Sequence, residues 1–198
     1  MFWMLLGLLL FLGPHSLRML LPRWRQMAIV RVGESKWRSA FSLISFVGLF
    51  LVGYGFSGVR EDPTVIWLPS LWTRYLAWGL SLIAFVLWGA AAVPGNLIKF
   101  QVHHPLVLGT GLWAFAHLVS NGMLAHLFLF GSIFLWSLAS YFAARVRDVE
   151  ESVPYPRGSL LATLGAIFIG SGVWLVTWVW LHGWLVDIRP VSWSLLFE

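Results

Sequence analysis

Six histidines carry most of the chemistry that this sequence could support, because the chain contains no cysteine. The lack of cysteine rules out disulfides, thiolate zinc sites, iron–sulfur clusters and covalent haem attachment. His15 and His117 are the strongest candidates, since each lies within a long apolar segment, where an ionisable side chain is by default a functional candidate. Any metal would therefore be bound by imidazole or carboxylate groups.

The two candidate histidines share a local pattern of residue types. Each follows a glycine eight residues earlier and an aromatic residue four residues earlier. In an α-helix, three residues at this spacing lie on one face, where a small residue, a flat ring and an imidazole form a surface that a planar macrocycle could pack against. We therefore predict cofactor-binding surfaces formed by Gly7, Phe11 and His15 in one segment and by Gly109, Trp113 and His117 in the other.

The depths of the two histidines favour a group held between them. His15 lies about 9 Å from the inner end of its segment, and His117 lies about 18 Å from Pro105, at 1.5 Å per residue. A difference of about 9 Å prevents a direct hydrogen bond, but it suits two imidazoles on opposite faces of a haem iron. The alternative is that each histidine donates a hydrogen bond to a backbone carbonyl of a neighbouring helix.

The other histidines allow further interpretations. His117, His126 and His182 all fall near the outer surface, and three imidazoles could bind a transition metal. His103 and His104 directly precede a proline at a helix start, where an interfacial or capping role is the simplest interpretation.

All eight acidic residues lie outside the apolar segments. Carboxylate-based ion pumps and antiporters usually need an acid near the membrane midplane, so this class is disfavoured. Arg74, close to the start of an apolar segment, either extends to the membrane interface or contacts an anion such as a cofactor carboxylate. The eight acidic residues outside the segments are Glu34, Glu61, Asp62, Asp148, Glu150, Glu151, Asp187 and Glu198.

Composition identifies the elements that must position these residues as membrane-spanning helices. The 198 residues are 59% hydrophobic and 11% charged, whereas soluble domains are about 45–50% apolar and about 25% charged. A spanning helix needs about 20 mostly apolar residues. We predict one all-α domain over residues 1–198, a polytopic bundle of about six spans: Met1–Leu21, Ser39–Phe56, Leu71–Ala92, the shorter Pro105–Val119, Met123–Phe142 and Leu160–Trp184.

The basic residues orient this bundle. Six spans place ten lysines and arginines on one side and three on the other, and the side richer in positive charge faces the cytoplasm. Both termini are therefore expected outside the cytoplasm, and the net charge of +5 needs no nucleic-acid partner. The ten are Arg18, Arg23, Arg25, Arg31, Lys36, Arg38, Lys99, Arg145, Arg147 and Arg157, and the three are Arg60, Arg74 and Arg189.

Short motifs across most of the chain resemble one family. The densest block runs from His104-Pro105 through Trp113-Ala114-Phe115-Ala116-His117 to Asn121-Gly122, and earlier pieces include Gly13-Pro14-His15-Ser16-Leu17-Arg18 and Arg31-Val32-Gly33-Glu34. In order and spacing, these pieces resemble the NnrU-like membrane proteins, which are related to the zeta-carotene isomerases.

The resemblance implies a haem b protein of the membrane. In the isomerases two histidines ligate the haem, and the matching positions here are His15 and His117. The isomerases carry a cysteine three residues before the second ligand, whereas Ala114 stands at that position here, a feature in which the chain resembles the bacterial members. The family is associated with denitrification, and its members' location implies the bacterial inner membrane.

Three functions follow from these observations. The first is a bis-histidine haem b protein that supports nitrogen-oxide metabolism, with nitric oxide or other membrane redox proteins as partners. The second is a haem-dependent cis–trans isomerase of a polyene or another lipid-soluble substrate. The third is a scaffold or assembly subunit without haem. Whether the protein is an enzyme is left open by the sequence.

Overall fold

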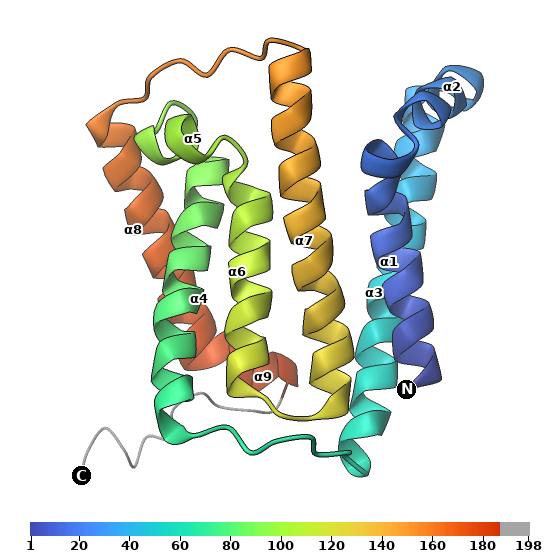
Figure 1. The fold of residues 1–198 in the computed structure, drawn as a ribbon, viewed down its shortest axis with the longest axis vertical. Helices are drawn as coiled ribbons and strands as arrows, with labels where there is room; N and C mark the ends of the chain where they lie inside the picture. Colours follow the sequence, from blue (N-terminus) through green and yellow to red (C-terminus); the bar gives the residue numbers. More distant parts are fainter. Residues whose placement is uncertain (187–198) are drawn as a thin grey trace.

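Long α-helices running side by side form the body of the protein (Figure 1). The computed structural model describes residues 1–186, and the prediction of an all-α membrane bundle is confirmed. Arg189, Asp187 and Glu198, which the sequence placed outside the spans, lie outside the described residues. The helices are α1 (Phe2–Leu20), α2 (Pro22–Val32), α3 (Glu34–Glu61), α4 (Leu71–Ala92), α5 (Leu97–Val102), α6 (Pro105–Ser120), α7 (Leu124–Glu150), α8 (Leu160–Val176), the π-helical turn η1 (Thr177–Leu181) and α9 (His182–Val186).

Five of these helical segments are long and apolar enough to cross a membrane, namely α1, α3, α4, α7 and the segment Leu160–Leu185. The remaining predicted span, α6, has 16 residues and is therefore about 24 Å long, less than the roughly 30 Å of a bilayer core. It is covered by α4 and α7, so its short length is accommodated inside the bundle. Successive long helices alternate in direction, and the N-terminus and α9 lie at the same end (Figure 1).

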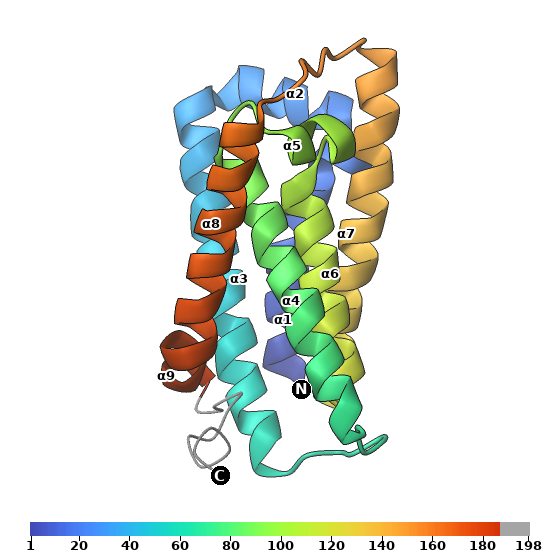
Figure 2. The same cartoon turned by 90° about the vertical axis from the view of Figure 1, so that its left-hand side faces the viewer.

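Two short helices that the sequence did not predict lie at the opposite end. α2 crosses this end at a steep angle to the long helices, and α5 lies beside the start of α6 (Figure 2). Asn96 caps α5, because its side-chain oxygen accepts the backbone N–H of Lys99. The same side chain donates to the carbonyls of Ala90 and Val93, which ties α5 to the end of α4.

The helices contact one another as an open series. In the described residues the order of neighbours is α3, α1, α7, α6, α4 and α8. The two end members, α3 and α8, lie on opposite sides of the molecule (Figure 1) and share no substantial contact. α7 therefore stands between the helix of His15 and the helix of His117.

Glycines set the closest helix contacts. A Cβ atom added at Gly7 of α1 would lie 2.5 Å from the backbone nitrogen of Val52 on α3, and one added at Gly48 would lie 2.7 Å from that of Phe11. At Gly170 of α8 an added Cβ would lie 2.5 Å from the Phe85 carbonyl oxygen on α4. Small residues allow membrane helices to approach this closely. These glycines therefore let α3 pack closely on α1 and α8 pack closely on α4, at the two ends of the series.

Candidate functional site

His15 lies in the C-terminal half of α1 and faces α3 and α7. Its Nδ1 is 2.6 Å from the carbonyl oxygen of Phe11 and donates its proton there. The imidazole centroid lies 4.6 Å from the Phe11 ring, 4.7 Å from the Phe41 ring on α3 and 6.0 Å from the Trp136 ring on α7. These contacts fix the ring and leave Nε2 as its acceptor atom.

His117 lies near the other end of the bundle, in the last turn of α6. Its Nδ1 is 2.9 Å from the carbonyl oxygen of Trp113. The imidazole stacks on Phe130 of α7 with the ring centroids 4.4 Å apart, and its centroid lies 4.7 Å from the Trp113 ring. Asn121 donates a hydrogen bond to the His117 carbonyl and secures the end of the helix.

The two histidines thus have the same local geometry. In each, the proton on Nδ1 is donated to the backbone carbonyl one turn earlier, and Nε2 makes no hydrogen bond within residues 1–186. Histidines that ligate a metal through one nitrogen almost always donate the other N–H to a carbonyl, a carboxylate or water. Each imidazole is therefore suited, in tautomer and orientation, to ligate iron through Nε2. The alternative prediction was a hydrogen bond to a carbonyl of a neighbouring helix, whereas the accepting carbonyl belongs to the histidine's own helix.

The structure does not bring His15 and His117 together. They lie on either flank of α7, against Trp136 and Phe130, and those two residues are separated by about 9 Å along the helix axis. A metal–imidazole bond is about 2 Å long, so two imidazole nitrogens that held one metal ion would lie no more than about 4 Å apart. The tautomers of the two imidazoles suit the ligation of a haem iron. In this structure, however, α7 stands between the two rings, and they do not meet at one site.

The other residues predicted to bind the cofactor have distinct positions. Phe11 and Trp113 contact the histidines on their own helices, as the spacing predicted. Gly7 packs against α3, and a Cβ atom added at Gly109 would lie 2.8 Å from a carbonyl oxygen of α4. The two glycines therefore sit in helix contacts. Arg74 is exposed in the first turn of α4, at the end of the bundle opposite α2.

A row of rings crosses the end of the bundle near His117. Phe56 of α3, His126 and Phe130 of α7, His117 of α6 and His182 of α9 follow one another with centroid separations of 5.3, 5.9, 4.4 and 6.4 Å. Within residues 1–186, the buried Nδ1 atom of His126 has no hydrogen-bond partner.

The alternative of a three-histidine metal site is not supported by this row. Among the described residues, no group of three or more histidine, cysteine, aspartate or glutamate side chains is arranged to hold a metal ion. The sequence placed His117, His126 and His182 at the same end correctly, but Phe130 stands between two of the imidazoles.

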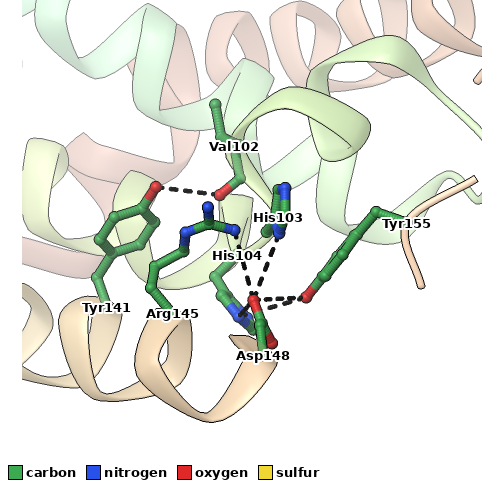
Figure 3. A network of polar contacts seen from close by, with 7 residues as sticks. All are labelled: Val102, His103, His104, Tyr141, Arg145, Asp148 and Tyr155. Carbon is green, nitrogen blue, oxygen red and sulfur yellow. Dashed lines mark hydrogen bonds and ion pairs between the residues drawn. The ribbon is translucent and has the colours of Figure 1, made fainter. Parts of the chain in front are cut away.

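His103 and His104 form a polar network around Asp148, a residue that the sequence did not single out as part of a site (Figure 3). Asp148, near the end of α7, accepts from Nε2 of His104 at 2.8 Å and from the Tyr155 hydroxyl at 3.1 Å. The Nδ1 atom of His103 lies 3.4 Å from the same oxygen, and a guanidinium nitrogen of Arg145 lies 3.5 Å from it. One carboxylate thus joins α7, the turn before α6 and the loop before α8.

The backbone at this network is constrained. His103 has a φ of 61°, in a region that non-glycine residues rarely occupy, and its ring lies 3.7 Å from the Tyr155 ring. Burial raises the pKa of Tyr155, and its hydrogen bond to Asp148 raises this pKa further, so the phenol remains a donor. The sequence indicated this turn through His103 and His104 beside Pro105, but it did not identify Asp148 as the residue that contacts both histidines.

A protein-family model matches nearly the whole chain. The family model described as NnrU protein matches residues 3–190 of the chain. Comparisons with curated proteins and with solved structures give no match.

Proposed function

Because the chain belongs to the NnrU family, we propose that it binds haem b within the membrane, with Nε2 of His15 and Nε2 of His117 as the iron ligands. The hydrogen bond from each Nδ1 to the carbonyl one turn earlier carries this proposal. It presets the tautomer that ligation requires and lowers the cost of orienting the ring. Two histidines in different helices share this arrangement, and both stand in apolar surroundings.

Ligation of one iron by both histidines requires movement around α7. His15 would leave its contact with Trp136, and His117 would leave its stack on Phe130. The open series of helices favours such a movement, because α3 and α8 do not close the bundle. Phe11, Phe41 and Trp113 would remain as the apolar walls that exclude water.

Haem supplies one-electron chemistry when bound. With both His15 and His117 as ligands, a bound haem would favour electron transfer or sensing over reaction with a substrate. We place this activity in nitrogen-oxide metabolism and in the bacterial cytoplasmic membrane, on the basis of the family and of the basic residues gathered at one end. Nitric oxide or another membrane redox protein is the proposed partner.

A second candidate function is the isomerisation of a lipid-soluble polyene. The observation that favours it is the open, apolar series of helices, in which the two end helices lie apart. Ala114 cannot supply a thiolate, so one histidine would have to leave the iron before a substrate could approach it. Analysis of the products formed from a cis-polyene by the reduced protein tests this candidate.

Purification from haem-replete cells tests the leading proposal. We expect a Soret band, split α and β bands on reduction, and about one haem per chain. His15→Ala and His117→Ala should each lose or weaken these bands, while His126→Ala, a matched change in the same region, should keep them. A wild-type protein without colour would overturn the proposal, and loss of haem in only one of the two ligand variants would reduce it to a single ligand.

A further inference from the structure

The helix α2 has no buried residue, although it is built into an otherwise packed protein. It has 11 residues, and helices shorter than about 12–15 residues are marginal in water. α2 contacts α1 and α3, and three of its residues, Arg25, Ala28 and Ile29, are half-buried. Most of its side chains are therefore available to contact a surface outside the chain.

The outward face of α2 combines apolar and basic side chains. Trp24, Met27 and Val30 are 49%, 54% and 74% exposed. Arg23 and Arg31, four residues to either side of Met27, lie on the same face and are also exposed. Basic residues alternating with tryptophan and aliphatic residues are typical of helices that lie in the membrane interface.

The position of α2 agrees with that environment. It lies across the end of the bundle, at a steep angle to the spanning helices (Figure 2). The Trp24 ring packs edge-on against Trp37 of α3, with the centroids 6.2 Å apart, and tryptophans concentrate at membrane interfaces. The end of α1 and the start of α3 therefore hold α2 across the end of the bundle.

Charge decides which headgroups this face would bind. α2 carries three arginines and no acidic residue. The nearest acidic residue along the chain, Glu34, is paired with Arg38 one turn further on. The face formed by Arg23, Trp24, Met27, Val30 and Arg31 is thus positive and partly apolar. A surface with negative charge above an apolar layer is its complement.

We propose that α2 is an interfacial helix that binds the headgroups of anionic phospholipids through Arg23 and Arg31, with Trp24, Met27 and Val30 inserted at the acyl boundary. The guanidinium groups form charge-assisted hydrogen bonds with phosphate oxygens. Bound lipid orders the short helix and, through it, the link between α1 and α3. This proposal does not depend on haem.

Native mass spectrometry of the full-length protein in detergent tests this inference. Phosphatidylglycerol and phosphatidylcholine with identical acyl chains are titrated separately. We expect the wild-type protein to prefer phosphatidylglycerol, and Arg23→Gln/Arg31→Gln to weaken its apparent affinity roughly 10- to 30-fold. The control Arg25→Gln/Arg74→Gln removes equal charge from the inward face of α2 and from the far end of the bundle, and it should stay within about twofold of wild type.

Two results of this titration would overturn the proposal. One is equal affinity of the wild-type protein for the two lipids, and the other is an unchanged preference in Arg23→Gln/Arg31→Gln. Wild-type protein alone provides a second test that does not rely on a folded variant: raising the ionic strength should release phosphatidylglycerol, because salt screens exposed charges. Retention at high salt would exclude a headgroup interaction based on charge.

Discussion

The contact between α1 and α3 makes a sharp prediction for Gly48→Ala. The added Cβ atom would lie 2.7 Å from the Phe11 nitrogen and 2.9 Å from the Gly7 carbonyl oxygen, whereas ordinary contacts begin at 3.4 Å. Both obstructing atoms belong to the backbone of α1, so neither can move aside by a side-chain rotation. The two helices must therefore separate by about 0.7 Å, and overpacking of this kind costs about 1–3 kcal/mol.

A matched control lies on the same helix. An alanine Cβ at Gly53 of α3 would meet nothing within 4 Å, so Gly53→Ala should be neutral or stabilising by up to about 1 kcal/mol through helix propensity. Thermal unfolding in detergent, followed by near-ultraviolet circular dichroism, measures both variants. At about 2–4 °C per kcal/mol, Gly48→Ala should melt several degrees below Gly53→Ala. Equal melting temperatures, or the reverse order, would refute the close contact.

Other parts of the structure give further expectations. Asp148→Asn should lower the free energy of unfolding by about 1–3 kcal/mol, because His104 and Tyr155 lose a charged acceptor; chemical denaturation measures the change against wild type, and Tyr54→Phe on the exposed face of α3 is the control that should alter stability little. The raised pKa of Tyr155 means that its contribution is intact below about pH 10 and is lost as the pH rises through the raised value; Tyr155→Phe should abolish that alkaline loss in a pH series of melting temperatures. Ile83→Arg, at an exposed position midway along α4, should impair membrane insertion by about 2.5–3.5 kcal/mol in a glycosylation-based insertion assay, and efficient insertion would show that this face does not meet lipid.

The spans were predictable because hydropathy reports the hydrocarbon layer directly. Leu71–Ala92 was predicted with the bounds that α4 has. α7 was predicted to end at Phe142 but continues to Glu150. Hydropathy detects only the apolar part of a helix, so it did not predict the polar helical turns from Arg145 onward. Asp148 joins these turns to the segments of His104 and Tyr155.

The candidate site was predictable only along each helix. Spacing correctly placed Phe11 beside His15 and Trp113 beside His117, because residues four apart share a helix face. The order in which helices pack depends on contacts between distant residues, such as Gly48 against the backbone of α1. A single sequence holds no pattern that reports such contacts, so the position of α7 between the two histidines was not foreseen.

Electron paramagnetic resonance of the oxidised protein tests the central proposal most directly, because it reports the axial ligands of the iron. We predict a low-spin ferric signal in the wild-type protein and in His126→Ala, and conversion to a high-spin signal or loss of the signal in His15→Ala and in His117→Ala. A low-spin signal that persists unchanged in either of these two variants would contradict the assignment of that histidine as a ligand.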